Sequence, residues 1–372
     1  MKATLTSFDV ARVAQVSQSA VSRTFTPGAS VSEATRRKVL EAARKLGYRP
    51  NAHARSLITK RSRIIGLVLS HLENLLYPVA LEQLAVRLQR DGYHVLLFVN
   101  DNLDADELVG EILQYHVDGI VLASATLSSG LARQCADASI PVVLFNRVMG
   151  QSGVGGQSTV SSVRTDNVNG GMAVANYLVQ AGHQRMAYIA GNEESSTNLE
   201  RERGFRDGLA LHAQRIWARG VGNYDFEQAR IATRALFGAG SERPDAVFVA
   251  SDHMAFAVMD TLRFELGLRV PQDVSVVGFD NVPQAQWGSY RLSTVEQPVG
   301  LMIEATVGLL QNYLRDEATR PAENVVIPGE LILRDSSRAL IEPAHAAIFS
   351  VANQSPPVTP PSVPADVSMA EI

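Results

Sequence analysis

Two side chains near the N-terminus are of the kind that pairs with the edges of purine bases. Gln18 carries an amide and Arg23 a guanidinium, and each group can form two parallel hydrogen bonds with one base. The segment around them is basic, because Met1 to Arg63 holds 13 Lys and Arg against 3 Asp and Glu. Clustered positive charge attracts polyanions such as nucleic acid. A solvated basic face without a partner would show the same charge. The secondary structure that carries these residues is therefore needed to distinguish the two interpretations.

Three short helices are expected to carry these side chains. An acid follows Thr6 by three residues, the spacing of a capping box, and apolar residues then recur at helical spacing. Ser17 can cap a second helix over 18–24, and Ser32 a third that ends at Gly47. Two short helices joined by a tight turn, with a third across them, form a helix-turn-helix, whose second helix can enter a major groove. A three-helix unit that serves only for packing is the alternative.

A series of motifs continues this pattern as far as Leu57. They are Phe8-Asp9-Val10-Ala11-Arg12-Val13-Ala14-Gln15-Val16-Ser17, Ala20-Val21-Ser22-Arg23, Val31-Ser32, Thr35-Arg36, Leu46-Gly47-Tyr48-Arg49-Pro50-Asn51 and Ala54-Arg55-Ser56-Leu57. Together they resemble the LacI family of bacterial transcription regulators. The resemblance implies base-reading positions at Gln18, Ser19 and Arg23. It implies phosphate-contacting or helix-capping positions at Thr6, Ser17, Ser22 and Asn51.

The segment 51–57 resembles the family's hinge helix. The resemblance implies that this helix orders only on DNA, that Ala54 belongs to the DNA-binding set, and that Leu57 enters a central minor-groove step. The stretch is too short to be a stable helix alone, and an apolar wedge between base pairs is a known minor-groove device. The alternative for Leu57 is a linker residue that packs on the following domain.

Three positions depart from the family pattern. Gln15 stands where the family usually has a turn glycine, so we expect this turn to be strained or slightly different. Ala20 replaces the usual threonine, which removes one possible DNA contact. Ile58 stands where several members carry a small or basic residue.

The rest of the chain alternates short apolar runs with helical stretches. The runs are 64–69, 94–99, 119–123, 141–145, 186–189, 246–250 and 274–279, and the clearest helical stretches are 79–90, 170–181 and 254–266. This alternation predicts an α/β fold of parallel sheets covered by helices. The length of this body and a Gly/Ser-rich break at 149–159 favour two doubly wound subdomains with a ligand between them.

Landmarks of the same family continue through the body. They are Ile65-Gly66-Leu67-Val68, Val117-Asp118-Gly119-Ile120, Pro141-Val142-Val143, Gly182-His183, Arg201 with Gly204-Phe205, Ser251-Asp252-His253-Met254-Ala255, Gly278-Phe279-Asp280-Asn281, Thr294-Val295-Glu296-Gln297-Pro298 and Leu333-Arg334-Asp335-Ser336. The resemblance implies a fold of the periplasmic-binding-protein type in which the chain crosses between the subdomains three times.

Arg201 and Asp280 are the strongest candidates for holding a small effector. The resemblance places both in the cleft, and an Arg opposite an Asp suits a hydroxylated or anionic ligand because charge-assisted hydrogen bonds are short and directional. The alternative for Arg201 is an ion pair with Glu200 or Glu202, and for Asp280 a cap of a strand-end turn. Five further cleft-facing family positions, each equally compatible with a structural role, are Thr197, Phe226, Asn146, Asp252 and Tyr77.

Two details weaken the analogy with any one relative's ligand. Asn146 stands where many members of the family have Asp, and Leu75 where many have Pro. Asp252 has a specific alternative, because it can cap the helix that contains Met254.

Composition excludes several other classes of protein. A single cysteine, Cys135, cannot form an internal disulfide. We find no apolar run of about 20 residues and no signal-peptide pattern, so a cytoplasmic protein without membrane contact is expected. No catalytic constellation, cofactor fingerprint or metal-ligand spacing is present, so neither an enzyme nor a cofactor is expected.

The sequence therefore predicts a helix-turn-helix domain over 1–50, a hinge and linker over 51–63, an effector-binding core over 64–340 and a Pro-rich disordered tail over 341–372. We expect a homodimer that binds a pseudo-palindromic operator in double-stranded DNA. The family implies control by a sugar, sugar acid or sugar phosphate, most simply as a repressor. An activator or corepressor-dependent regulator, a periplasmic solute-binding protein and an enzyme with a doubly wound core are the alternatives.

Overall fold

The computed structural model describes residues 5–26, 28–49, 61–70, 72–100, 105–123, 129–149, 160–238, 242–315 and 321–340. The predictions for Asn51, Ala54 and Leu57, and for the tail 341–372, lie outside these ranges. No helix within them is both long and apolar enough to cross a lipid bilayer.

Three helices form the N-terminal domain as the sequence predicts. They are α1 (Ser7–Ala14), α2 (Gln18–Thr24) and α3 (Glu33–Leu46). The side chain of Ser17 accepts a hydrogen bond from the amide of Ala20, and Ser32 caps α3 in the same way. Val10, Val21 and Val39 are at most 1% exposed and form the centre of the core. Burial of these side chains against one another holds the short helices together.

The turn between α1 and α2 is strained, as the missing glycine predicts. Gln15 ends α1 at φ 54° and ψ 48°, in the left-handed region, and its amide bonds back to Ala11 and Arg12. An L residue with a Cβ adopts this conformation at a cost of about 1–2 kcal/mol. Gly47 ends α3 in the same region at φ 70°, where a glycine is free of this penalty.

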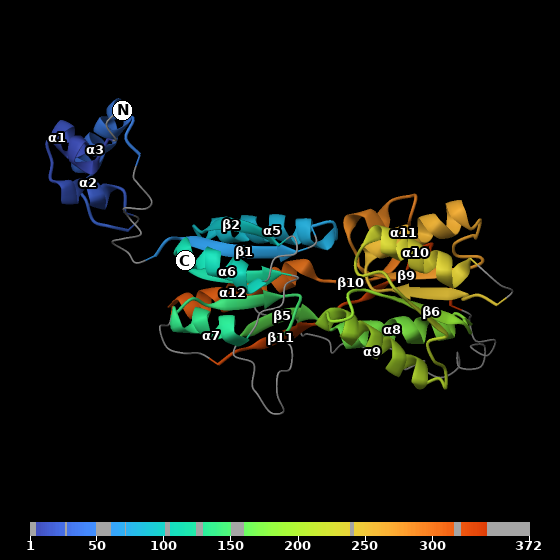
Figure 1. Ribbon diagram of the computed structural model, residues 1–372. Coiled ribbons are helices and arrows are strands. Elements are labelled where there is room, and N and C mark those ends of the chain that lie inside the picture. The colour runs from blue at the N-terminus through green and yellow to red at the C-terminus, as the bar shows by residue number, and fades with distance from the viewer. Residues whose placement is uncertain are drawn as a thin grey trace, which may run out of the picture.

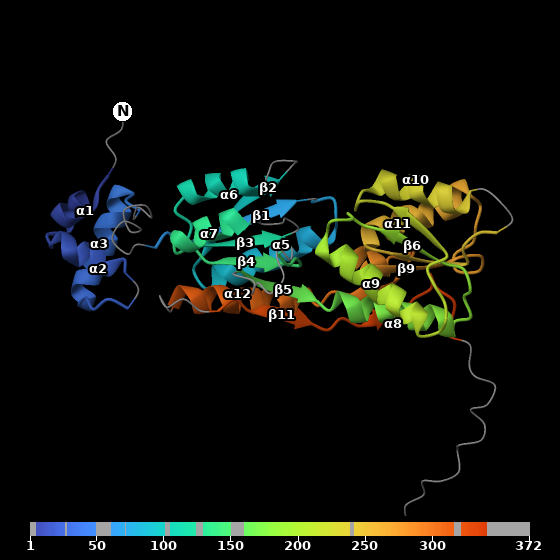
Figure 2. The ribbon, with the colours of Figure 1, turned by 60° about the horizontal axis from the view of Figure 1, so that its bottom comes forward.

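Two six-stranded sheets, each covered by helices, form the rest of the described chain (Figures 1 and 2). The first sheet has the order β11-β5-β4-β3-β1-β2 and the second β12-β10-β9-β8-β6-β7. All neighbouring strands are parallel except β12, which pairs antiparallel with β10. The strands are β1 (Ile64–Ser70), β2 (His94–Asn100), β3 (Gly119–Ala123), β4 (Val142–Phe145), β5 (Ser161–Thr165), β6 (Met186–Ala190), β7 (Ala218–Val221), β8 (Ala246–Val249), β9 (Ser275–Asp280), β10 (Ser293–Glu296), β11 (Asn324–Ile327) and β12 (Leu331–Ile332).

The helices lie on both faces of each sheet. They are α5 (Leu76–Arg90), α6 (Ala105–Gln114), α7 (Ser129–Asp137), α8 (Asn167–Gln180), α9 (Ser196–Ala210), α10 (Phe226–Phe237), α11 (Asp252–Asp260) and α12 (Val299–Arg315). A π-helical turn, Thr261–Glu265, continues α11, and a 3-10 turn covers Pro283–Gln286. In β1, Leu67 and Leu69 face α5 and α12, whereas Val68 faces α6 and α7. Figures 1 and 2 show α8 and α9 on one face of the second sheet, with α10 and α11 on the other.

The chain crosses between the two subdomains three times, as the resemblance implies. The crossings follow β5, β10 and β11, and two of them are joined by a 2.8 Å hydrogen bond from the Asp166 amide to the Ile327 carbonyl. All seven apolar runs form strands, but the break at 149–159 does not divide the subdomains. Strands β4 and β5 flank it and pair in the same sheet. A change of loop composition was therefore a wrong guide to this boundary, because such a loop can also connect neighbouring strands.

Helices α8 and α9 approach each other unusually closely. A Cβ on Gly204 of α9 would lie 1.9 Å from the carbonyl oxygen of Val168, and a Cβ on Gly171 of α8 would lie 2.3 Å from that of Arg201. Only glycine allows this backbone contact. The contact sets the position of α9, and hence of Arg201.

Substitution of Gly204 tests this close approach. We expect Gly204→Ala to lower the free energy of unfolding by about 2 kcal/mol, because the new methyl collides with backbone rather than with a movable side chain. Gly308→Ala is the matched control: a Cβ there meets nothing within 4 Å, and Ala in a helix interior is more stable than Gly by about 0.5–1 kcal/mol. Urea unfolding followed by circular dichroism measures both, and equal stability of Gly204→Ala and the parent would contradict the packing argument.

The strained turn in the N-terminal domain gives a second prediction. Gln15→Gly should stabilise α1 and α3 by about 1 kcal/mol, and Gly47→Ala should destabilise them by a similar amount. A Cβ on Gly47 meets nothing within 4 Å, so its effect comes from backbone conformation alone. Amide hydrogen exchange of these helices in the full chain reports the change. Shifts of the same sign in both variants would show that the left-handed conformation is not the cause.

Candidate functional site

The polar face of α2 is open to solvent. Six residues predicted to contact DNA lie on or beside it and are exposed: Thr6, Ser17, Gln18, Ser19, Ser22 and Arg23. Gln18 donates a 3.2 Å bond to the hydroxyl of Ser7, and Arg23 donates a 3.4 Å bond to the Ser19 carbonyl. Each bond uses one donor, so the other donors of the amide and the guanidinium remain for a base edge or a phosphate. Thr6 completes its capping box with Asp9, as predicted.

A second polar site lies between the subdomains, at the carboxyl ends of strands. In open parallel sheets ligands bind at this edge, where loops from neighbouring strands diverge. A small cavity, with room for about 10 Å³, occupies this position. Its lining consists of Asn74, Tyr77, Asn146, Arg147, Thr197, Arg201, Tyr224 and Asp280.

Arg201 is the more deeply buried of the two arginines in the cleft lining, with 2% of its surface exposed. Its Nε donates to Asn167 of α8 at 2.9 Å, and its Nη1 donates to the carbonyl of Ala250 at the end of β8. The guanidinium lies 3.7 Å from the centroid of the Phe279 ring and 3.7 Å from the Asp280 carboxylate. These contacts replace the hydration that burial removes. The predicted alternative, an ion pair with Glu200 or Glu202, is not formed, since Glu200 binds Arg164 and Glu202 binds Arg206 and Arg219.

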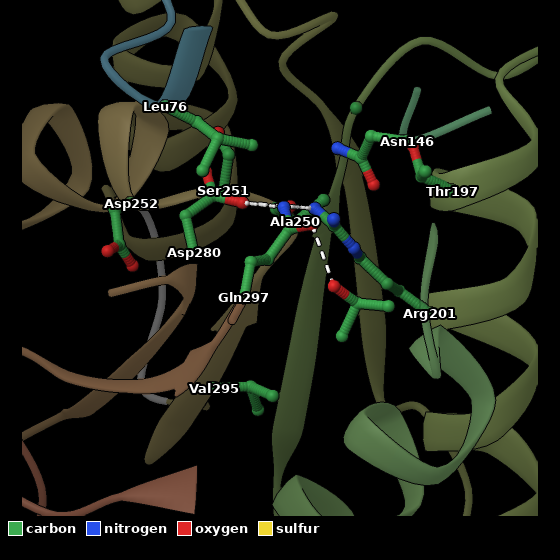
Figure 3. Close-up of polar contacts among 12 residues, drawn as sticks. Leu76, Asn146, Thr197, Arg201, Ala250, Ser251, Asp252, Asp280, Val295 and Gln297 are labelled. Atoms are coloured by element: carbon green, nitrogen blue, oxygen red, sulfur yellow. Dashed lines mark hydrogen bonds and ion pairs between the residues drawn. The ribbon is translucent and has the colours of Figure 1, made fainter. Parts of the chain in front are cut away.

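Asp280 lies beside Arg201 at the end of β9, in the same subdomain (Figure 3). Its backbone has φ 138°, a conformation that L residues rarely adopt, and such strain is typical of functional sites. Gln297 fixes it, because its amide donates to the Asp280 carbonyl at 3.1 Å and its side-chain Nε2 to Oδ1 at 2.6 Å. Burial raises the pKa of Asp280, while Arg201 acts in the opposite direction. The second carboxylate oxygen, Oδ2, is buried and has no hydrogen-bond partner within the described residues.

Asn146 and Arg147 follow β4 on the opposite wall. Asn146 is 2% exposed in the left-handed conformation, at φ 57°, and its side-chain Oδ1 is a second buried oxygen without a partner among the described residues. Arg147 is 5% exposed and donates from Nη1 to the Asn146 carbonyl at 2.8 Å and to the Thr197 hydroxyl at 3.0 Å. The bond to Thr197 joins the two subdomains, because β4 and α9 belong to different sheets.

Three hydroxyl-bearing residues complete the lining. The Thr197 hydroxyl also contacts the hydroxyl of Tyr224 at 3.1 Å and that of Ser195 at 2.9 Å, so it mainly positions its neighbours. Burial raises the pKa of the Tyr77 phenol, which therefore remains a neutral hydrogen-bonding group. The described lining thus offers buried acceptors on Asn146 and Asp280, together with cationic and phenolic donors, a set that suits a ligand rich in hydroxyl groups.

Two of the predicted effector residues lie outside the lining. Phe226 begins α10, and its ring packs 5.7 Å from that of His253. Asp252 is buried, but Figure 3 shows its carboxylate turned away from Arg201. It accepts from the amide of Val282 at 3.0 Å and from the hydroxyl of Thr294, which ties α11 to β9 and β10.

The role of Asp252 is structural, although not as the predicted cap. Ser251 provides that cap, because its Oγ accepts from the Met254 amide at 3.4 Å. Burial, and then repulsion from Asp280, raise the pKa of Asp252.

Asn74, Arg147 and Tyr224 line the cavity although the sequence did not single them out. Arg147 directly follows a predicted strand end, so the strand-end rule could have identified it. Tyr224 has φ 61° after Asn223 with φ 51°, a pair of left-handed residues that turns the chain two positions before Phe226. Nothing in the local sequence indicates that turn. Asn74 lies before α5, and its Oδ1 accepts from the Leu76 amide at 3.2 Å.

Two protein-family models match this chain. Residues 7–51 match the model of bacterial regulatory proteins of the lacI family, and residues 175–337 match the periplasmic binding protein-like domain. The chain is 32% identical over 335 residues to the HTH-type transcriptional regulator CelR of Thermobifida fusca. The aligned region covers 88% of this chain and 96% of CelR. The chain is 29% identical over 339 residues to the transcriptional repressor PurR of Vibrio vulnificus (strain CMCP6), with coverage of 89% and 98%.

Solved structures give the same result. A complex of the regulator CelR with cellobiose has 30% identity and a TM-score of 0.67, covering 90% of this chain and all of the other (100%). The lac repressor dimer bound to operator and the anti-inducer ONPF has 26% identity and a TM-score of 0.79, with coverage of 90% and 99%. The DNA-binding face, the two parallel-sheet subdomains and these relatives lead to one conclusion: the chain belongs to the LacI family of bacterial regulatory proteins.

Proposed function

We propose that this chain binds a pseudo-palindromic operator as a homodimer and represses transcription under the control of a hydroxylated ligand in the cleft. The observation that carries the proposal is the pair of buried, unpartnered oxygens on Asn146 and Asp280, in a chain that also exposes a DNA-reading helix. A buried acceptor without a donor is costly, and a ligand hydroxyl would satisfy it.

The cleft is nearly closed in this conformation. The cavity has room for about 10 Å³, roughly the space of one water molecule, whereas ligand pockets are typically about 300–1,000 Å³. A ligand would therefore enter when the two subdomains move apart. We propose a sugar, sugar acid or sugar phosphate as the ligand, because the polar lining and the family resemblance both favour this class.

The contacts across the cleft suggest how the ligand would act. Arg147 and Thr197 join the subdomains directly, and Gln297, in the crossing after β10, holds Asp280. A ligand that bonds to both walls would change the relative position of the subdomains, and through it the geometry of the two DNA-binding domains of a dimer. The family resemblance supports the hinge over 51–63, with Asn51, Ala54 and Leu57 on DNA, and the boundaries 1–50 and 64–340. The Pro-rich composition supports the tail over 341–372. Activation or corepression by the ligand is the alternative.

Catalysis and cellular location are the two remaining properties. The relatives are regulators of transcription rather than enzymes, and the described cavity lining contains no Ser, Cys, Lys or His. We therefore propose that the chain is not an enzyme. Because it acts on chromosomal DNA, we propose a cytoplasmic location.

Selection from a random duplex library at about 150 mM salt tests the function. The full chain is used alone and with a pool of sugars and sugar acids. We expect a palindrome of about 14–20 base pairs, with two half-sites one or more helical turns apart, whose recovery changes with a ligand. Failure to enrich any sequence under either condition would contradict the proposal.

Arg23→Lys separates base reading from charge. Lysine keeps the positive charge but loses the planar fork that pairs with a guanine edge. Affinity for the selected operator should fall by about 1–3 kcal/mol, whereas affinity for random DNA and its salt dependence should stay the same. Electrophoretic mobility shifts at several salt concentrations measure both, and an equal loss on the two DNAs would exclude a base-reading role.

Leu57→Ala tests the hinge in a similar way. Removal of an apolar wedge should weaken specific binding, because the central base step is no longer held open, and leave salt-driven non-specific binding nearly intact. The same mobility-shift titration applies. If non-specific binding fell as much as specific binding, Leu57 would serve the stability of the protein rather than the recognition of DNA.

A further inference from the structure

We propose that the cleft selects an anionic ligand, a hydroxylated small molecule with one carboxylate or phosphate group, and that Arg147 is the side chain that binds this group. The inference rests on the proposed function, because it concerns the same ligand. It narrows the proposed ligand class from sugars, sugar acids and sugar phosphates to the acidic members of that class.

The starting point is the charge of the cavity wall. Among its eight described lining residues, Arg147 and Arg201 are cationic and Asp280 is the single carboxylate. All three are at most 5% exposed. The wall therefore carries an excess of positive charge where little water can solvate it, a situation that proteins normally relieve by pairing.

The two guanidinium groups differ in their surroundings. Arg201 has a carboxylate at 3.7 Å, two hydrogen bonds and the Phe279 ring. Arg147 bonds only to neutral oxygens, the Asn146 carbonyl and the Thr197 hydroxyl, and no ion pair within the described part of the chain includes it. Both of its bonds use Nη1, which leaves Nε and Nη2 for a further partner. A planar pair of donors of this kind matches a carboxylate or phosphate.

The neighbour of Arg147 carries an amide where an acid would neutralise it. Asn146 has nearly the shape of Asp but no charge, and its buried Oδ1 has no partner among the described residues. The positive charge of the cavity wall is therefore left for the ligand to neutralise. A hydroxyl on Asn146 Oδ1 and an anionic group on Arg147 would satisfy these adjacent residues together.

The amino end of α9 also favours an anionic group near Arg147. Ser195, the N-cap of this 15-residue helix, makes no side-chain cap bond, and Thr197 in the first turn bonds to Arg147. The amino end of a helix carries a partial positive charge that favours an anion nearby. Arg147 follows β4 of the first sheet and Asp280 ends β9 of the second, so a ligand between the subdomains can place its anionic group near Arg147 and a hydroxyl near Asp280.

Matched ligands test the proposal on the full chain. Glucose, galactose and mannose are compared with their uronic acids and their 6-phosphates by isothermal titration calorimetry at constant ionic strength. We expect at least one acid or phosphate to bind about 10-fold or more tightly than its neutral parent. Whether the uronic acids or the 6-phosphates bind more tightly shows whether the site prefers a carboxylate or a phosphate. If no acid or phosphate binds more tightly than its parent, including the case in which none binds, the proposal is wrong.

Two variants locate the effect at Arg147. Arg147→Gln should weaken the acidic ligand by about 30-fold or more and its neutral parent much less, because only the former loses its counter-charge. Asn146→Asp keeps the shape and tolerates the left-handed backbone, and should remove the preference for acids by neutralising Arg147 internally. Arg206→Gln, on an exposed side chain of α9, should change nothing. Equal loss of acidic and neutral ligands in Arg147→Gln, with the preference for acids retained in Asn146→Asp, would show that Arg147 only supports the fold.

Failure of this inference is distinguishable from failure of the proposed function. A neutral sugar that bound more tightly than its acid, and still altered operator binding, would overturn the selection of an anion and leave the regulator intact.

Discussion

The burial of one guanidinium organises the ligand-binding half of this protein. Arg201 can be held at 2% exposure only because α8, the end of β8 and the end of β9 all direct oxygen atoms or an aromatic face towards it. Its place on α9 in turn requires the close contact of α8 and α9 that Gly171 and Gly204 allow. The strained backbone of Asp280 follows from the same requirement, since it turns a carboxylate back towards the cation.

The same cluster reaches the segments that join the subdomains. Gln297, in the crossing after β10, donates to Asp280 from its side-chain Nε2, and its side-chain Oε1 accepts from the hydroxyl of Thr165 at the crossing after β5. A ligand bound to Asp280 therefore acts on a residue that is fixed by two of the three crossings. This gives the cleft a physical connection to the relative position of the subdomains, which is the quantity that a dimer could transmit to two DNA-binding domains.

Local physical chemistry explains which features were predictable from the sequence. The helix caps were predictable because each depends on a residue three positions away, as at Thr6, Ser17 and Ser32. The seven apolar strands were predictable because each is a short run of apolar residues. Strands such as β5 and β7 were not predicted, because Ser161–Thr165 and Ala218–Val221 are short and partly polar. Their pairing comes from neighbours far away in the chain.

The site was predictable to a similar degree. Arg201, Asp280, Thr197, Asn146 and Tyr77 line the cavity, and each was identified through a family position. Tyr224 takes a cavity position instead of Phe226 because two consecutive left-handed residues turn the chain there. Asp252 has the right type and burial, but its carboxylate is used within the fold by Val282 and Thr294. Such distinctions depend on where a side chain points, which spacing in the sequence does not determine.

The central claim is that one chain couples the occupancy of the cleft to the binding of an operator, and reciprocity tests it most directly. The dissociation constant for the selected operator is measured with and without the tightest-binding ligand of the calorimetric series. The dissociation constant for that ligand is measured on free and on operator-bound protein. The account predicts the same factor in both experiments, about 5–150-fold, because the coupling free energy belongs to the pair of sites. Unchanged affinities in both would show that the cleft and the DNA-binding domain act independently.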